Sequence, residues 1–232
     1  MKERYNIIDF LRGFTIIHMI IFHLIFDLIN FYNFDINMNF YYYQQYICIS
    51  FVFLAGLSEN FSKNRIKRSI ILGISSILIS VFSFIFDRSY TIYFGVIHFF
   101  FSAGIIFYLI EKFSIKLNKK ILFFVSLFLF IIFKDIYKGS IFFNLIDLPK
   151  NLYTYNLFIL GLPKATFTSG DYFPIIPWIF LYFSGYYFYE FLNIKKRMPS
   201  QNIINILGRH SLIIYLLHQV ILVAILKLIL AS

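Results

Sequence analysis

Histidine and aspartate side chains stand inside long apolar stretches of this sequence. The five histidines all lie in or at the edge of such stretches, at His18, His23, His98, His210 and His218. His23 and Asp27 are four residues apart, so on a helix they share one face. A carboxylate at this spacing can hold one imidazole N–H and raise the basicity of the other ring nitrogen. The pair therefore predicts a general base, whereas His18, about 140° around the helix from His23, is expected to pack.

The composition identifies the solvent in which this chemistry would take place. Of the 232 residues, 60% are hydrophobic, 22% aromatic and 14% charged, whereas soluble domains have about 45–50% apolar and about 25% charged residues. The mean hydropathy is +0.77. These values exclude a soluble globular domain and predict an all-α, polytopic transmembrane helix bundle that forms a single domain over residues 1–232.

Seven segments are apolar and long enough to span a bilayer, which takes about 20 residues. They are residues 8–30, 41–59, 69–87, 90–110, 120–138, 172–192 and 204–230. The fifth is the weakest, because Lys134, Asp135 and Lys138 shorten its apolar run. Residues 139–171 contain several Pro and Gly and are expected to form a long loop that does not span.

The net charge of +10 indicates topology rather than a nucleic-acid partner, because the basic residues cluster between the apolar runs. If the N-terminus is cytoplasmic, most of the 21 Lys and Arg residues fall on the cytoplasmic side: Lys2, Arg4, Arg12, Lys63, Arg65, Lys67, Arg68, Lys112, Lys116, Lys119, Lys120, Lys195, Lys196, Arg197 and Arg209. The positive-inside rule then predicts seven spans with the N-terminus inside and the C-terminus outside.

Three histidines are expected at a similar depth in the bilayer. At 1.5 Å per residue, His23 and His218 lie roughly 22 and 21 Å from the inner ends of their spans, and His98 lies about 12 Å from the outer end of its span. His23, His98, His218 and Asp27 could therefore line one cavity toward the outer half of the membrane. The alternatives are histidines that only bond neighbouring helices, and an Asp27 that marks the outer interface.

The inner ends of the spans are cationic. Arg12 lies within the first span, Arg209 opens the last, and Arg65 and Arg68 belong to a basic run at residues 63–68. Cations at this mouth could bind the phosphates of a nucleotide carrier. The alternative is positive-inside anchoring with contacts to lipid headgroups.

Five segments, in this order, resemble the heparan-α-glucosaminide N-acetyltransferase-like catalytic family. They are Arg4-x4-Asp9-x2-Arg12-Gly13 with Met19-x3-His23-x3-Asp27-Leu28, then the runs at residues 51–58 (FVFLAGLS), 93–98 (YFGVIH), 171–178 (DYFPIIPW) and 207–219 (LGRHSLIIYLLHQ). The resemblance covers nearly the whole chain. It implies a membrane acyltransferase that takes acetyl groups from cytoplasmic acetyl-CoA and transfers them to the amine or hydroxyl of a sugar-type acceptor on the outer side.

The resemblance also implies roles for individual residues. His23, oriented by Asp27, would be the base or would carry the acetyl group, and His98 and His218 would be donors to the oxyanion. The CoA phosphates would contact the basic inner mouth, at Arg12, Arg209, His210, Ser211, Arg65 and Arg68. Asp171 and Trp178 would bind the acceptor at the outer mouth, and no metal is implied. Because the family's histidine is expected in the segment after the first helix and residues 30–40 contain none, His23 either replaces that base or stands at the position of its partner.

Two other functions fit the same residues. Intramembrane histidines could relay protons or bind a solute in a transporter, and a non-catalytic membrane subunit could keep the polar cavity without turnover. The expected location is a bacterial cytoplasmic membrane. The expected partners are the lipid bilayer, acetyl-CoA and a sugar-type acceptor, with no nucleic acid, and the many Phe side chains would allow a homodimer.

Overall fold

The computed structural model describes residues 5–36, 39–62, 64–112, 117–195 and 198–230. Six of the basic residues used for the topology prediction lie outside these ranges: Lys2, Arg4, Lys63, Lys116, Lys196 and Arg197. The described residues contain eight α-helices, namely α1 (Asn6–Tyr32), α2 (Tyr41–Glu59), α3 (Arg65–Phe86), α4 (Val96–Lys112), α5 (Lys119–Phe133), α6 (Ile175–Phe188), α7 (Ile203–Arg209) and α8 (Ser211–Leu230). Each predicted span coincides with one or two of them, so the described chain is mostly helical, as predicted.

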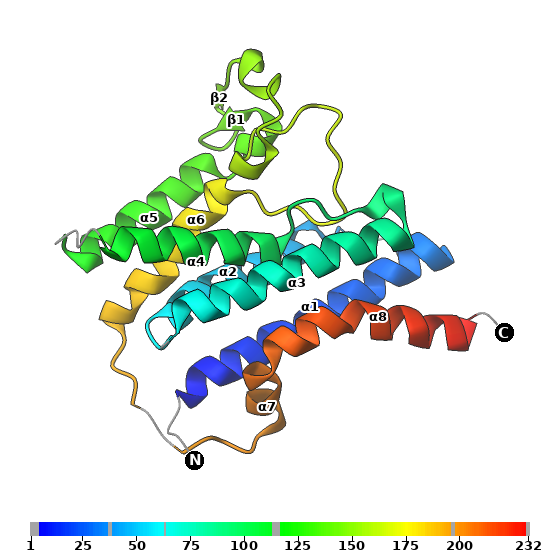
Figure 1. The fold of residues 1–232 in the computed structure, drawn as a ribbon, viewed down its shortest axis with the longest axis horizontal. Coiled ribbons are helices and arrows are strands. Elements are labelled where there is room, and N and C mark those ends of the chain that lie inside the picture. Colours follow the sequence, from blue (N-terminus) through cyan, green and yellow to red (C-terminus); the bar gives the residue numbers. More distant parts are fainter. Residues whose placement is uncertain (1–4, 37–38, 63, 113–116, 196–197, 231–232) are drawn as a thin grey trace. The chain divides into compact units, whose positions relative to one another are not determined.

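The chain forms two compact units, one of residues 1–54 with 193–232 and the other of residues 55–192. In the first unit, α1 lies beside α8, and α7 crosses one end of α1 (Figure 1). Ile16, Met19 and Ile47 form the buried core between α1 and α2. Partly buried apolar side chains pack against this core, among them Phe51 of α2, Leu207 of α7 and Ile214 of α8.

Glycines bring the backbones of α1 and α7 into direct contact. A Cβ atom on Gly13 would lie 1.8 Å from the carbonyl oxygen of Ile204, and one on Gly208 would lie 1.8 Å from that of Asp9. Only a residue without a Cβ fits at either position. This contact fixes the direction of α7 against the N-terminal part of α1.

The last predicted span, at 204–230, is not one helix, and this part of the prediction was wrong. α7 ends at Arg209, His210 is its C-cap, and α8 begins at Ser211. The His210 N–H donates to the carbonyl oxygens of Ile206 and Leu207. The helix axis changes here because α7 follows its close backbone contact with α1, so Arg209 ends a short helix and does not open a long one.

In the second unit, α3 lies beside α4 and α5 lies beside α6 (Figure 1). Three expected helix bounds are corrected here. α4 begins at Val96, because Phe94 pairs in a β-bridge with Tyr172, and α6 begins at Ile175, after Pro174. α5 ends at Phe133, so its 15 residues are fewer than a bilayer crossing takes.

Residues 139–171 contain no α-helix within the described chain, as expected for a loop that does not span. They hold the two-stranded sheet of β1 (Ser140–Ile141) and β2 (Ile146–Asp147), and the short 3-10 helices Lys150–Tyr153 and Phe158–Leu160. The Tyr172 hydroxyl donates to the carbonyl oxygen of Phe158 at 2.6 Å. Burial raises the pKa of the Tyr153 hydroxyl, which donates to the carbonyl oxygen of Ile136.

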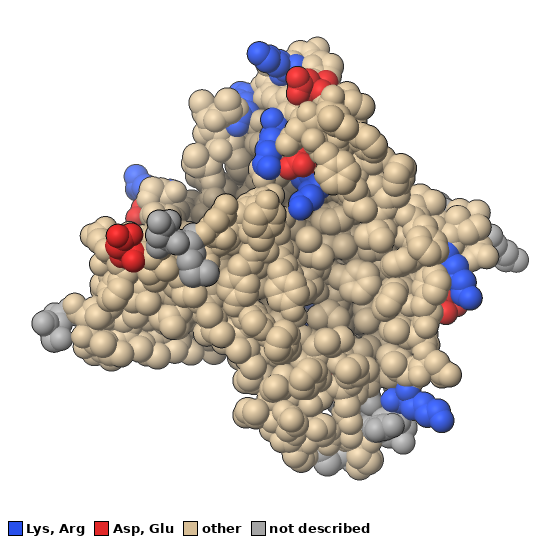
Figure 2. All heavy atoms as spheres, turned by 180° about the vertical axis from the view of Figure 1, so that it is seen from behind, with Lys and Arg blue, Asp and Glu red and all other residues tan. Residues whose placement is uncertain are grey.

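Three helices, α1, α3 and α8, are long and apolar enough to cross a membrane. Much of their surface is apolar and exposed, as in Ile77 and Leu78 of α3. Figure 2 shows a face on which charged side chains are few and other side chains fill most of the area. These helices make the chain an integral membrane protein.

Candidate active site

His23 of α1 and His218 of α8 lie against each other in the first unit. Their ring centroids are 4.7 Å apart, with the ring planes inclined at 60°. The His23 ring also contacts Phe22, but among the described residues its side chain forms no hydrogen bond. Of the three histidines expected to share a cavity, the structure brings these two together.

Hydrogen bonding fixes the tautomer of His218. Its Nδ1 lies 2.6 Å from the carbonyl oxygen of Tyr215. A carbonyl oxygen only accepts hydrogen bonds, so Nδ1 carries the proton and Nε2 of the neutral ring keeps its lone pair. This Nε2 is buried and has no partner within the described chain. His218 therefore presents a buried basic nitrogen that is ready to accept a proton.

Asp27 does not hold His23, which corrects the expected hydrogen bond. The side-chain amide of Gln219 donates to both Asp27 carboxylate oxygens, at 2.9 and 3.0 Å. Asp27 is fully buried, so this amide supplies hydrogen bonds that a buried carboxylate requires. The shared face of His23 and Asp27 was predicted correctly, but the sequence does not reveal which residue of another helix the carboxylate meets.

Gln219 is a polar residue of α8 to which the sequence pattern assigns no role. The available signal was its position directly after His218 within an apolar helix. Its Oε1 atom is buried and unpartnered within the described chain. The α1–α8 interface thus contains two unsatisfied acceptors, His218 Nε2 and Gln219 Oε1.

Arg12 and Ser211 meet at the other end of the same helix pair. The Arg12 guanidinium donates to the Ser211 hydroxyl at 2.7 Å, and the buried Ser211 begins α8. Arg209 instead donates to the carbonyl oxygen of Ser200 at 2.7 Å, while His210 is exposed at the α7–α8 junction. The four residues expected to bind CoA phosphates in this unit therefore lie at or next to one helix junction. From Arg12 to His23 the helical rise is roughly 16 Å.

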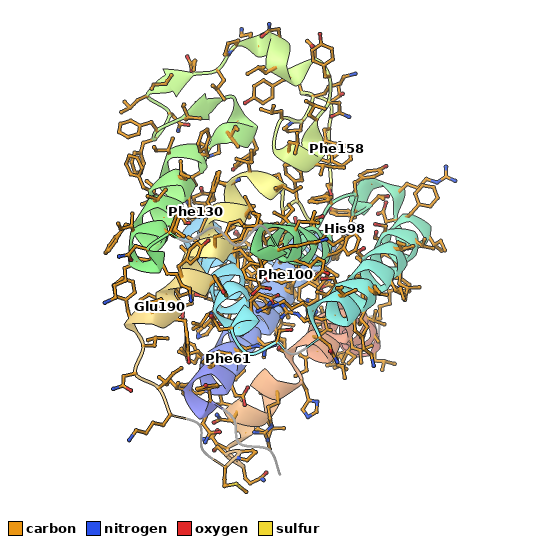
Figure 3. All side chains as sticks on the ribbon, turned by 60° about the vertical axis from the view of Figure 1, so that its left-hand side comes forward. Phe61, His98, Phe100, Phe130, Phe158 and Glu190 are labelled. Carbon is orange, nitrogen blue, oxygen red and sulfur yellow. The ribbon has the colours of Figure 1, made fainter. Side chains whose placement is uncertain are left out.

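His98 belongs to the second unit, near the start of α4 (Figure 3). The Ser80 hydroxyl donates its single hydrogen to the carbonyl oxygen of Ile92 at 2.7 Å, so it accepts from His98 Nε2 at 3.0 Å. The Gly95 N–H donates to His98 Nδ1 at 3.3 Å. Both ring nitrogens are occupied, as in a histidine that stabilises the α3–α4 pair.

Arg65 and Arg68 surround a buried carboxylate that sequence reasoning missed. Arg68 Nη1 lies 3.0 Å from Glu59 Oε1, and Arg65 Nε lies 3.6 Å from Glu59 Oε2. The buried Tyr182 hydroxyl also donates to Glu59, at 2.5 Å. Because Arg65 also pairs with Glu111, two carboxylates balance these two guanidinium groups. The only available signal was a lone acidic residue at the end of the second apolar run.

Asp171 and Trp178 have packing roles in the second unit. The Val96 N–H donates to the Asp171 carboxylate at 3.0 Å, so Asp171 caps the N-terminus of α4. The Trp178 ring lies 4.7 Å from that of Phe173 and 5.6 Å from that of Phe130, which is labelled on α5 in Figure 3. The acceptor-binding roles of these two residues stay predictions.

Comparison with known families identifies the family of this chain. Residues 4–220 match the family described as heparan-alpha-glucosaminide N-acetyltransferase, catalytic. The chain belongs to this family. The match covers both units and confirms the resemblance seen in the five sequence segments, and the family is one of acetyl-CoA-using membrane acetyltransferases. No curated protein and no solved structure matches the chain.

Proposed function

We propose that this protein is a transmembrane acetyltransferase that moves an acetyl group from cytoplasmic acetyl-CoA to an amine or hydroxyl of a sugar-type acceptor on the outer side. The observation that carries the proposal is the buried His23–His218 pair, in which His218 has a fixed tautomer and an open Nε2. Membership of the acetyltransferase family supports it. A buried imidazole with an open lone pair is the group that acyl transfer to a neutral nucleophile requires.

The proposed topology has seven spans, with the N-terminus inside and the C-terminus outside. Support comes from the apolar runs, each of which contains at least one helix, with α7 and α8 together forming the last crossing. Because α5 has only 15 residues, the residues that follow Phe133 complete its crossing in this topology. The bias of the basic residues toward one side is the argument for the orientation. In this topology, the Arg12 end of α1 faces the cytoplasm and His23 lies beyond the midplane.

The α7–α8 junction is the proposed site for the CoA phosphates. Arg12 and Arg209 carry the positive charge there, and the Ser211 hydroxyl and the His210 ring add polar groups. Arginine suits this role because its planar guanidinium can bind two phosphate oxygens at once. The Glu59 carboxylate already contacts Arg65 and Arg68, which favours the α7–α8 junction over the basic run at residues 63–68.

The proposed reaction is direct transfer through a tetrahedral intermediate. An imidazole of the pair takes a proton from the acceptor N–H or O–H while the acceptor atom bonds to the thioester carbonyl carbon. When the intermediate collapses, the C–S bond breaks and the same proton passes to the CoA sulfur. The products are the acetylated acceptor and free CoA.

The proposal is tested with the full chain reconstituted in lipid nanodiscs with radiolabelled acetyl-CoA. We expect label to reach an amino-sugar acceptor, and the double variant His23→Ala/His218→Ala to lose at least about 100-fold in rate, as removal of acid–base catalysis commonly causes. His18→Gln is the matched control, since this α1 histidine hydrogen-bonds to the Tyr43 hydroxyl of α2 at 2.8 Å and has no role in the proposed reaction. Binding of acetyl-CoA without any transfer would support a non-catalytic subunit and contradict the proposal.

A further inference from the structure

His218 Nε2 and Gln219 Oε1, the two unpartnered acceptors of α8, belong to consecutive residues. Each of these residues contacts α1. His218 lies against His23, and Gln219 bonds Asp27, one helical turn further along the same face of α1. Buried polar atoms nearly always have a hydrogen-bond partner, so two unpartnered ones at one helix interface require an explanation. A bound molecule that donates two hydrogen bonds supplies it.

We infer that His218 Nε2 and Gln219 Oε1 together form the subsite for the attacking group of the acceptor, with His218 as the base and Asp27 as a positioning residue that acts through Gln219. This inference rests on the proposed acetyl transfer. It assigns Gln219 a binding role, and it exchanges the roles first expected for the two histidines. An unprotonated Nε2 cannot donate to an oxyanion, so His218 is the base in this arrangement and not an oxyanion donor.

The orientation of the Gln219 amide follows from Asp27. The amide nitrogen faces both carboxylate oxygens of Asp27, at 2.9 and 3.0 Å, so the amide oxygen faces away from Asp27. The opposite orientation would set the amide oxygen against the carboxylate oxygens. Asp27 therefore orients the Gln219 amide so that its Oε1 atom remains an acceptor without a partner in the described chain.

The chemistry of the two atoms selects the ligand. The carbonyl oxygen of a thioester is itself an acceptor and satisfies neither atom, so the pair faces the nucleophile and not the acyl donor. The nucleophile must offer two neighbouring donors, as a neutral primary amine or two adjacent hydroxyls of a sugar do. A lone hydroxyl satisfies one acceptor and leaves the other buried and unpaired.

The step that follows is balanced. The donor hydrogen bound to His218 Nε2 moves to that nitrogen as the acceptor atom bonds to the thioester carbon. The second donor stays bonded to Gln219 Oε1 and holds the nucleophile in line. Collapse of the intermediate breaks the C–S bond, and His218 returns the proton to the CoA sulfur.

The first experiment measures steady-state transfer in nanodiscs with glucosamine, glucose and 1-propanol as acceptors, and acetyl-CoA hydrolysis without an acceptor. For Gln219→Leu we expect the KM of the sugar acceptors to rise by about 10-fold or more, as expected when a buried hydrogen bond to the substrate is lost, while the KM for acetyl-CoA stays within about twofold. The exposed Gln44 provides the matched control, Gln44→Leu. Glucosamine and glucose distinguish an amine from paired hydroxyls, because mass spectrometry of the product shows N- or O-acetylation.

The second experiment separates the two histidines and tests the role of Asp27. We expect His218→Ala to lower kcat by about 100-fold or more and to remove the rising limb of the pH–rate profile. His23→Ala is expected to lower kcat by less. Because Asp27 acts through Gln219, Asp27→Asn/Gln219→Leu is expected to be no worse than Gln219→Leu alone. If Gln219→Leu does not fold, Gln219→Met replaces it with a side chain of similar length.

The outcomes distinguish this inference from the proposed function. A wild-type protein without any transfer contradicts the proposed function itself. If the wild type is active but Gln219→Leu raises the KM for acetyl-CoA and the KM for the acceptor equally, Gln219 has only a structural role. This result overturns the inference. A larger kcat loss in His23→Ala than in His218→Ala overturns it as well, because His23 is then the base.

Discussion

The carboxylate of Asp27 accepts two hydrogen bonds from the side-chain amide of Gln219, at 2.9 and 3.0 Å, although the two residues are 192 positions apart. This contact joins α1 to α8 at the turn of α1 that follows His23. It holds a fully buried carboxylate and a partly buried side-chain amide in a single orientation. The site in the first unit is therefore built by a pairing between the first and last long helices.

Loss of the Asp27 carboxylate should weaken the α1–α8 pair. In Asp27→Ala the Gln219 amide loses its acceptor in a buried place, so we expect a destabilisation of about 1–3 kcal/mol. Thermal unfolding in a fixed detergent measures it. The matched control is Asp35→Ala, because Asp35 is exposed in the segment after α1; equal melting temperatures for both variants would argue against a stabilising contact.

Loss of the Arg12 guanidinium should weaken binding of acetyl-CoA. A hydrogen bond to a charged group contributes about 1.5–3 kcal/mol, so Arg12→Ala is expected to raise the KM for acetyl-CoA by about 10- to 100-fold while changing the acceptor KM little. Titration with CoA by calorimetry gives an independent measurement.

The control for this prediction is Lys195→Ala, since Lys195 is an exposed cation on the same expected side of the membrane. If both variants change the KM for acetyl-CoA by a similar small amount, the cationic end acts only through its overall positive charge and Arg12 makes no specific contact. Arg12→Lys adds a further comparison, because an ammonium keeps the charge and loses the planar fork of the guanidinium.

The positions of the helices could be predicted from the sequence because a bilayer requires long apolar runs, and this requirement is local. The break at His210 could not, because α7 takes its direction from the contact of Gly208 with the carbonyl oxygen of Asp9, a residue far away in the sequence. The start of α4 depends on a similarly distant pairing, between Phe94 and Tyr172.

The site was predictable only where it depends on local spacing along one helix. The spacing of His23 and Asp27 shows that they share a face, but only tertiary structure shows that Asp27 meets Gln219. His98 was grouped with His23 and His218 only because of its estimated depth in the bilayer. Its two occupied nitrogens depend on Ser80 and the Gly95 N–H, and no spacing rule reveals them.

Glu59 should be a stabilising residue of the second unit. Its side chain is nearly fully buried and contacts Arg65, Arg68 and the Tyr182 hydroxyl. Glu59→Ala leaves those donors without their acceptor, and because both arginines are partly exposed we expect a loss of about 1–3 kcal/mol rather than the full cost of a broken buried pair. Thermal unfolding of the variant in nanodiscs measures this loss.

Glu190→Ala is the comparison for Glu59→Ala. Glu190 pairs with Lys119 at 2.8 Å, but both side chains are well exposed, so its loss should change stability by less than about 1 kcal/mol. If the two variants unfold at the same temperature, burial of Glu59 contributes no stability and the proposed difference is wrong.

The close contact of α1 with α7 should tolerate no added methyl group. A Cβ on Gly13 or Gly208 would lie 1.8 Å from a backbone carbonyl oxygen, and a backbone atom cannot move aside as a side chain can. Gly13→Ala and Gly208→Ala should each destabilise the first unit by at least about 1–3 kcal/mol, as overpacking does, and should expose the α7 segment to protease. Gly73→Ala is the control, because the atoms nearest to its Cβ would belong to the side-chain ring of Phe101, at 3.0 Å, and this ring can rotate. Since Arg209 and Ser211 flank the displaced junction, we also expect both α7-contact variants, and not Gly73→Ala, to bind CoA more weakly; unchanged CoA affinity would separate the helix contact from the phosphate site.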